Sequence, residues 1–349
     1  MNFRISPRIA YWLFGLFLAG VAGLTGLWFT GAAQVRDQIA ALGRSAVGES
    51  GIFTVQKLDI TGFPFSFETR LTGIVLAGRD KRGPWEWRAD SAILGLSPWR
   101  GRDITFDLAG SHKLRFRAGR VPMEVELTAA RAPGEVRLGG GGTPHLIRIA
   151  PQHIDAREIT TGAHLTADKT SFELFVAAES PSTATEPAAG LLVDLRGIKL
   201  PESLGKFLGP KLDHFSAEVQ VLGELPAPID RRALTRWRDS GGSIELKSLA
   251  MQWGPAKVDG SGTLTLDTLL QPEASFAARM TGFEETADAL VTAGLIRAQE
   301  AQGVKLLLSL MARRSDPGRG AEIRVPITIQ ERVIYVGPAR LTRLPLIRW

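Results

Sequence analysis

The residue types that most often carry out enzyme chemistry are sparse in this 349-residue chain. It has five histidines and no cysteine, which excludes thiolate catalysis, Cys-ligated zinc, iron–sulfur clusters and disulfides. His153 and Asp155 stand two positions apart, a spacing that places both side chains on one face of a strand. Such a pair is more often a hydrogen-bonded surface pair than a metal site.

Three further patterns have ordinary structural interpretations. The four glycines at 139–142 are not followed by the lysine and helix of a phosphate-binding loop. Gly260-Ser261-Gly262 lacks the spacing of a nucleophile elbow, and we interpret its glycines as turn residues. Three carboxylates, which we take as solvated strand residues, are Asp90, Asp103 and Asp107. We therefore predict a non-enzymatic protein with no catalytic residues, no cofactor and no bound metal.

The charge balance gives no indication of nucleic-acid binding. Lys and Arg number 42 against 36 Asp and Glu, a net charge of +6 that is spread along the chain. Basic residues cluster only as dyads such as Arg231-Arg232 and Arg313-Arg314, and no basic helix or zinc finger is evident. A mildly basic surface that tolerates anionic lipid headgroups is the simpler interpretation.

The strongest local signal lies near the N-terminus, where residues 9–35 contain no charged side chain. About 20 apolar residues form a helix long enough to cross the hydrocarbon layer of a membrane. The residues that we assign to this anchor are Tyr11, Trp12, Phe14, Leu16, Phe17, Leu18, Leu24, Leu27, Trp28 and Phe29. Arg4 and Arg8 precede the run, which predicts a cytoplasmic N-terminus. We therefore expect a single-pass membrane protein with the bulk of the chain outside the cytoplasm. In a Gram-negative bacterium it would be an inner-membrane protein with this bulk in the periplasm.

A cleaved signal peptide is the alternative interpretation of the same run. Gly31-Ala32-Ala33 has the small residues of a cleavage site. The apolar stretch is longer than the core of a usual signal peptide, which favours a retained anchor. Both interpretations export the rest of the chain.

After the anchor, the hydrophobic pattern changes from helical to strand-like. Residues 34–48 have apolar positions at helical spacing. From Phe63 onwards apolar residues alternate with polar ones in short runs that are separated by Gly-rich and Pro-rich turns, which is typical of a large antiparallel sheet. Residues 178–190 are rich in Ser, Thr, Pro and Ala and are expected to form a loop or linker.

The expected organisation follows from these patterns. We divide the chain into a cytoplasmic tip and anchor (1–33), two halves of a β-rich periplasmic domain (34–177 and 191–349) and the intervening loop (178–190). Short helices are expected from Pro201 and over Asp230–Trp237, and one long helix over residues 284–312. Strands are expected at residues 323–329 and 333–336. The predicted fold class is α+β, mainly β, with a transmembrane helix before a large twisted antiparallel sheet.

Aromatic residues are the candidate contact surface. Phe63, Phe65 and Phe67 alternate along one predicted strand, and Trp85 and Trp87 lie on the next. Ordinary core packing between sheet and helix is one interpretation. The other is an open apolar strip that contacts acyl chains or a partner protein, because a sheet with few helices has more apolar face than it can cover.

Several segments, taken in order along the chain, resemble one bacterial protein family, catalogued as domain of unknown function 2125. The anchor comes first, and the segments after it are Gly62-Phe63-Pro64-Phe65-Ser66-Phe67, Trp237-Arg238-Asp239-Ser240-Gly241-Gly242, Trp253-Gly254-Pro255, Gly260-Ser261-Gly262-Thr263-Leu264-Thr265-Leu266-Asp267, Val325-Pro326-Ile327 and Val336-Gly337-Pro338. Where the family has an Asp-Gly hairpin near its end, this chain has Glu331-Arg332.

The family is similar to the broader AsmA-like group of envelope proteins, and this resemblance carries expectations about fold and function. It implies a curved, groove-forming sheet behind one membrane helix and a part in lipid movement or envelope homeostasis. It supplies no catalytic residue. The expected partners are the inner membrane and a phospholipid or another envelope lipid. The alternative function is envelope assembly or scaffolding, in which the sheet binds another protein.

Overall fold

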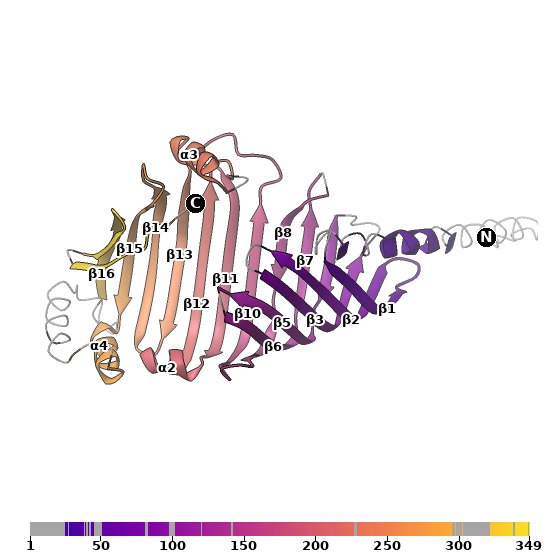
Figure 1. The fold of residues 1–349 in the computed structure, drawn as a ribbon, viewed down its shortest axis with the longest axis horizontal. Helices are drawn as coiled ribbons and strands as arrows, with labels where there is room; N and C mark the ends of the chain where they lie inside the picture. The colour runs from indigo at the N-terminus through magenta and orange to yellow at the C-terminus, as the bar shows by residue number, and fades with distance from the viewer. Residues whose placement is uncertain are drawn as a thin grey trace, which may run out of the picture. The chain divides into compact units, whose positions relative to one another are not determined.

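The computed structural model describes two compact units, Met1–Glu126 (unit 1) and Leu127–Trp349 (unit 2), and both are built mainly of antiparallel strands (Figure 1). The described residues are 25–26, 28–37, 39, 41, 43–44, 51–80, 83–97, 102–119, 121–140, 142–226, 229–294, 297, 302, 322–337, 339–347 and 349. Among them, no helix has both the length and the apolar character that a membrane span requires. The predicted anchor residues outside the described set are Tyr11, Trp12, Phe14, Leu16, Phe17, Leu18, Leu24 and Leu27.

Unit 1 is an antiparallel meander. Its strands are β1 (Ile52–Thr61), β2 (Phe67–Asp80), β3 (Gly83–Leu96), β4 (Asp103–Asp107) and β5 (Gly110–Ala118), and β6 (Val121–Arg131) crosses the boundary between the units. β2 pairs with β1 on one side and with β3 on the other. β3 in turn pairs with β4 near its C-terminal end and with β5 near its N-terminal end.

The N-terminal helix, described at residues 25–26, 28–37, 39, 41 and 43–44, packs on the apolar face of unit 1. Ile39 packs against a core formed by Leu71, Ile74, Ala89 and Ala92. The helix lies close to the sheet, because a Cβ on Gly31 would come within 2.7 Å of the Phe67 ring. A Cβ on Gly43 would come within 2.3 Å of the Phe53 ring. The predicted helix is therefore confirmed as far as Arg44, and it begins before residue 34.

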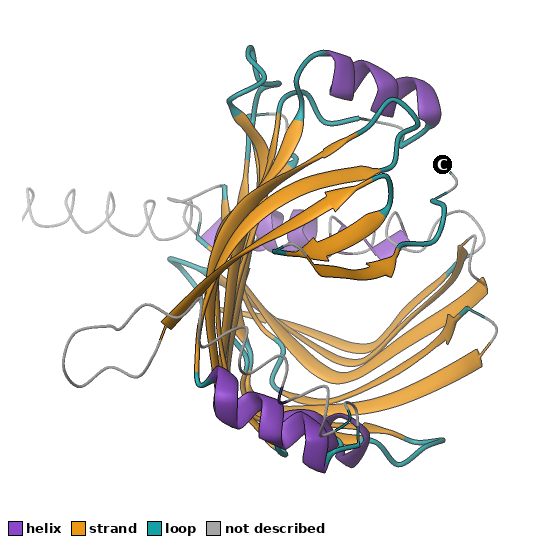
Figure 2. Ribbon diagram, turned by 90° about the vertical axis from the view of Figure 1, so that its left-hand side faces the viewer, coloured by secondary structure: helices purple, strands orange, loops and turns teal. Residues whose placement is uncertain are grey.

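Unit 2 contains a broad antiparallel sheet. Its strands are β7 (Pro133–Leu138), β8 (Pro144–Ile149), β9 (Gln152–Glu158), β10 (His164–Val176), β11 (Pro187–Lys199), β12 (Lys211–Leu222), β13 (Ser243–Trp253), β14 (Ala256–Leu266), β15 (Pro272–Thr281), β16 (Glu322–Gln330), β17 (Val333–Val336) and β18 (Ala339–Arg343). From β10 to β18 each strand pairs with the next one along the chain. The other edge of β10 pairs with both β8 and β9. The long strands are bent along their length (Figure 2).

The helices of unit 2 lie at the ends of its strands. α3 (Arg231–Asp239) lies at one end, and α2 (Glu202–Leu208) and α4 (Phe283–Thr292) lie at the other (Figure 1). α3 begins where Asp230 accepts a hydrogen bond from the backbone N–H of Ala233, as its sequence predicts. The predicted helix beginning near Pro201 is confirmed as α2.

Three sequence predictions differ from the structure of unit 2. The helix expected over 284–312 is wrong as one continuous element, because α4 ends at Thr292 and Gly294 takes a left-handed φ of 72°. The rest of the predicted span, apart from residues 297 and 302, lies outside the described residues. Residues 178–190 lie within unit 2 as the connection of the β10–β11 hairpin, and β11 already begins at Pro187. Gly260-Ser261-Gly262 is not a turn and lies in the middle of β14.

The buried core of unit 2 lies toward the ends of its long strands. At one end Leu234 and Trp237 of α3 pack against Leu266 and Leu270, with Val221 and Ile244 beside them. The buried residues toward the other end are Ala167, Ile198, Ala256, Phe283, Ala287 and Ile323. The middle of the sheet contributes none of these residues.

Candidate functional site

Two rows of paired residues cross the middle of the unit 2 sheet and point to the same face. The rows pass through eight strands, β8 and β10 to β16. The first row is Ile147, Leu174, Leu191, Val219, Leu246, Gly262, Phe276 and Ile327. The second is Ile149, Phe172, Val193, Ala217, Leu249, Gly260, Ala278 and Val325. Every position is apolar or glycine, and we call these two rows the apolar face.

The apolar face is continuous because a bulge in β13 corrects the side-chain alternation. Lys247 and Ser248 together oppose the single residue Ser261 of β14. Leu246 and Leu249 are three positions apart, and this extra residue puts both on the same face. A regular strand would have turned one of the two leucines to the opposite side.

The middle of the apolar face is uncovered. Phe172, Leu174 and Leu191 remain 36%, 41% and 42% exposed, and none of the other thirteen positions is fully buried. The rows extend over seven strand spacings, or about 34 Å, at about 4.8 Å per strand. An apolar surface of this length on a folded protein usually binds a partner or ligand.

The opposite face of the same strands is polar and hydrated. Between the two rows, Arg148 bridges Glu135 and Glu173 with N–O distances of 2.9 and 2.6 Å. On β11, hydrogen bonds from Arg196 and His214 lower the pKa of the Asp194 carboxyl. Such exposed pairs contribute little stability each. They show that this face carries the charged side chains of the strands, whereas the two rows of the apolar face, although also exposed, carry none.

The two glycines of the Gly-Ser-Gly segment are part of the apolar face. A Cβ on Gly262 would come within 2.3 Å of the Phe276 ring and 2.5 Å of the Ser275 carbonyl oxygen. A Cβ on Gly260 would come within 3.1 Å of the Ala277 carbonyl oxygen. Position 262 therefore requires glycine, and a side chain at 260 would have to displace the neighbouring strand by a few tenths of an ångström. The two glycines leave the apolar face without side chains on β14 at its centre.

The five sequence-predicted contact residues do not form one strip. Phe63 and Phe65 lie in the turn before β2, and Phe67 is the first residue of β2. Phe67 pairs with Leu96, whereas Trp85 and Trp87 pair with Gly78 and Leu76 near the other end of the same hairpin. The expected single strip is therefore wrong, because the register of the β2–β3 pair, in which Asp80 opposes Gly83, separates the two groups.

The two tryptophans and the three phenylalanines have different surroundings. The Trp87 ring stacks on His112 with centroids 5.8 Å apart, and it packs against the unit 1 core. Trp85 is half-buried. Phe63 and Phe65 are instead exposed. Trp87 thus has the core role that was one interpretation of the aromatic residues, while the phenylalanines of the turn remain available for contact.

The candidate catalytic residues are distributed over the surface. Asp155 pairs with His164 of the neighbouring strand at 2.9 Å, and not with His153. Asp107 accepts a hydrogen bond from the backbone N–H of Ala109. Ser261 is exposed on the polar face of β14. Within the described ranges, no group of three or more metal-ligating side chains comes together.

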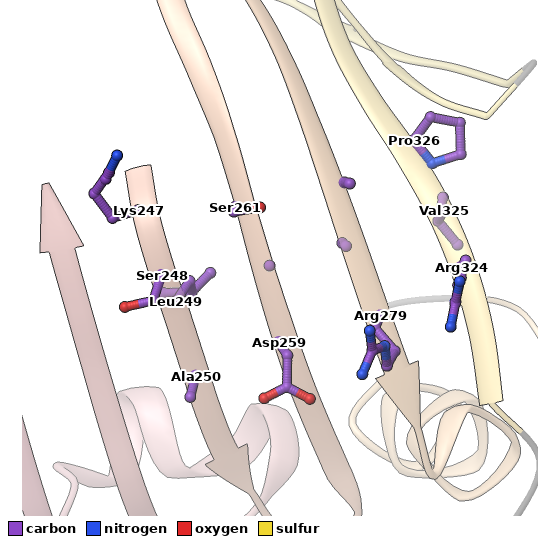
Figure 3. Close-up of a pocket in the computed structure, with 13 residues that line it drawn as sticks. Lys247, Ser248, Leu249, Ala250, Asp259, Ser261, Arg279, Arg324, Val325 and Pro326 are labelled. Carbon is purple, nitrogen blue, oxygen red and sulfur yellow. The ribbon is translucent and has the colours of Figure 1, made fainter. Parts of the chain in front are cut away.

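A hollow of ≈ 610 Å³ lies over β13 to β16, and its labelled lining is shown in Figure 3. Ser261, Asp259 and Arg279 contribute to its wall, as does Arg324. Glu322 pairs with both Arg279 and Arg324, at 3.2 and 3.3 Å. Its described lining includes no histidine, so Ser261 has no imidazole base there.

The sequence signal for the apolar face is present but incomplete. Alternation in β11 and β12 predicts one apolar side for each strand, and the scarcity of helices predicts that some of this surface stays open. The sequence does not show which residues of neighbouring strands pair, because this register depends on the β13 bulge and on the hairpin connections.

Comparison with known proteins gives a family match. The family described as “Uncharacterized protein conserved in bacteria (DUF2125)” matches residues 28–345. No curated protein and no solved structure matches the chain.

Proposed function

The chain belongs to this bacterial family, and we propose that it is a membrane-anchored periplasmic envelope protein that binds a lipid on the apolar face of unit 2. The observation that carries the proposal is the pair of uncovered apolar rows. The proposed activity is binding and transfer of the lipid without covalent chemistry. The charge-free run at residues 9–35 supplies the proposed inner-membrane anchor.

The dimensions of the apolar face suit acyl chains. One leaflet of a bilayer holds acyl chains in about 15 Å of hydrocarbon, half of the ~30 Å core. The rows extend about 34 Å across the strands, which leaves room for an extended chain. The side chains that would contact it are Phe172, Leu174, Leu191, Val219 and Phe276. Burial of their exposed surface is the proposed driving force.

Basic side chains at one end of the unit 2 sheet suit a lipid headgroup. α3 covers that end of the strands with Leu234 and Trp237 and exposes Arg231, Arg232 and Arg236. In the described part of the chain, no ion-pair partner accompanies these three arginines. They are the proposed contacts for an anionic headgroup.

Two neighbouring leucines of β11 provide a matched test. Leu191 belongs to the apolar face, whereas Leu192 points to the polar face, and the two are 42% and 40% exposed. The full chain and the Leu191→Glu and Leu192→Glu variants are purified from a Gram-negative host. Bound lipid is identified by native and denaturing mass spectrometry, and folding is checked by circular dichroism.

The expected result is stoichiometric lipid in the parent and in Leu192→Glu, with loss of most of it in Leu191→Glu. A carboxylate on the apolar face would be placed against hydrocarbon, which is strongly unfavourable. Absence of lipid from the folded parent would contradict the proposal, as would equal lipid in the two variants.

The second candidate function is scaffolding through a strand edge. β1 has ten residues, and within the described part of unit 1 it pairs only with β2. Its other edge therefore offers backbone donors and acceptors to an added strand. Photo-crosslinking from the exposed Thr54 of β1 and from Leu191 in cells separates the candidates. Lipid adducts at Leu191 support the first function, and a protein adduct at Thr54 alone supports the second.

A further inference from the structure

A cluster of aromatic rings lies where the N-terminal helix meets the β1–β2 turn of unit 1. The indole Nε1–H of Trp28 donates a hydrogen bond to the Ser66 carbonyl oxygen at 3.1 Å. The same indole stacks on Phe67 with centroids 5.6 Å apart. Phe29 and Phe63 contact it edge-on at 5.3 and 5.7 Å. These contacts attach the start of the helix to the turn.

The outer side of this aromatic cluster is exposed. Trp28 is buried at its centre, but Phe29, Phe63 and Phe65 are 63%, 50% and 65% exposed. Removal of the exposed part of each phenylalanine ring from water is favourable. Three such side chains on one small surface are therefore unfavourable in water and favourable at an apolar boundary.

The position of the cluster in the sequence indicates which boundary that is. Trp28 and Phe29 belong to the charge-free run at residues 9–35, and Phe63 contacts Trp28. Phe65 lies in the same turn, next to Ser66, whose carbonyl accepts the Trp28 hydrogen bond. Aromatic side chains are enriched at the headgroup level of membranes, where their rings contact acyl chains and their polar groups remain hydrated. The surface thus adjoins the proposed anchor directly.

We propose that Phe29, Phe63 and Phe65 insert into the headgroup layer and dock unit 1 on the surface of the membrane that holds the N-terminal run. This inference rests on the proposed membrane attachment. It adds a second contact, made by a turn far from the anchor in sequence. Unit 1 is then held against the bilayer surface instead of being tethered by the chain alone.

The natural absence of cysteine allows one probe to be placed at a time. Phe65→Cys places it in the cluster. Glu68→Cys places it nearby but on the opposite side of β2 from Phe67, because successive strand residues alternate. Arg79→Cys places it twelve residues beyond Phe67, about 40 Å away along the strand. Each full-length variant is labelled with an environment-sensitive fluorophore and reconstituted into phosphatidylethanolamine–phosphatidylglycerol vesicles.

Quenching by nitroxide-labelled lipid measures the contact. We expect the probe at position 65 to lose most of its fluorescence, with little loss at positions 68 and 79. Equal, weak quenching at all three positions in protein that resists carbonate extraction would overturn the docking and leave the anchor intact. Shielding of position 65 from aqueous iodide without lipid quenching would overturn it in favour of a protein contact. Release of the protein by carbonate would overturn both the docking and the anchor.

Discussion

At the scale of single residues, Glu158 shows how polar side chains stabilise the turns of unit 2. It lies at the end of β9 and is 7% exposed. Its carboxylate accepts hydrogen bonds from the Thr161 hydroxyl and from the backbone N–H groups of Thr160 and Thr161. The hydrogen bonds from Thr161, followed by those from Thr160, lower the pKa of Glu158 to about 2. The ionised form therefore stabilises the β9–β10 turn.

This arrangement predicts a pH-dependent effect of Glu158→Gln. Because the folded-state pKa is below the ordinary value of 4.5, the stabilisation is complete above pH 4.5 and is lost as the pH falls toward 2. The variant should unfold at lower urea concentration than the parent at neutral pH, and the difference should disappear near pH 2. Glu179→Gln, in the exposed loop after β10, is the control and should change little. A difference that is independent of pH would contradict the assignment.

At the scale of elements, the β16–β17 hairpin has a tight two-residue turn whose residues are unfavourable for its backbone conformation. Gln330 pairs with Val333 across a two-residue turn. Glu331 and Arg332 take positive φ values of 50° and 64°. Both angles are typical of a type I′ turn, which favours Asn-Gly or Asp-Gly. Glu331-Arg332 therefore occupies the kind of turn that Asp-Gly favours, although neither residue is among those that usually do.

The same hairpin predicts a stabilising change. A side chain in the left-handed region costs about 1–2 kcal/mol. Glu331→Asn with Arg332→Gly should recover about 1–2 kcal/mol of the free energy of local unfolding. Hydrogen exchange of β16 and β17 measures this directly, and we expect slower exchange. The control is Glu331→Ala with Arg332→Ala, which removes the same side chains but keeps the strain. Equal exchange in both double variants would show that the turn residues are not strained.

Strands and short helices could be predicted from the sequence, whereas their register could not. Period-two alternation indicated β2, β3 and β16, and the helical patterns indicated α2 and α3. The apolar face depends on which residues pair across eight strands, and one bulge at Lys247 and Ser248 changes that alignment. The glycines 260 and 262 were misplaced in a turn because a mid-strand glycine and a turn glycine look alike in one sequence. Their close approach to β15 is visible only when the neighbouring strand is in place.

At the scale of the whole molecule, the two units contain a similar strand feature with different coverage. Leu71-Thr72-Gly73-Ile74 lies in β2 and Leu195-Arg196-Gly197-Ile198 lies in β11, and both glycines have a φ of 63°. In unit 1 the N-terminal helix packs over Leu71 and Ile74. In unit 2 the described helices lie at the strand ends and leave the middle rows uncovered. The uncovered rows of unit 2 are therefore a different surface from the Phe63–Trp87 strip on which the sequence analysis placed an open apolar face.

The part of the N-terminal helix that packs on unit 1 gives a prediction for truncated chains. Removal of residues 1–24 should release the protein from membranes, because most of the charge-free run is lost, while Trp28 and Gly31 still pack on Phe67. Removal of residues 1–33 should also destabilise unit 1, by about 3 kcal/mol for the loss of a buried tryptophan. Hydrogen exchange of the β2 amides distinguishes the two truncated chains, and Trp28→Ala in the full chain is the matched point variant.

If β2 were equally protected in both truncations, residues 28–33 would be dispensable, as expected of a signal peptide cleaved after Ala33. Faster exchange in the shorter chain alone would identify these residues as part of the folded protein and favour the retained anchor.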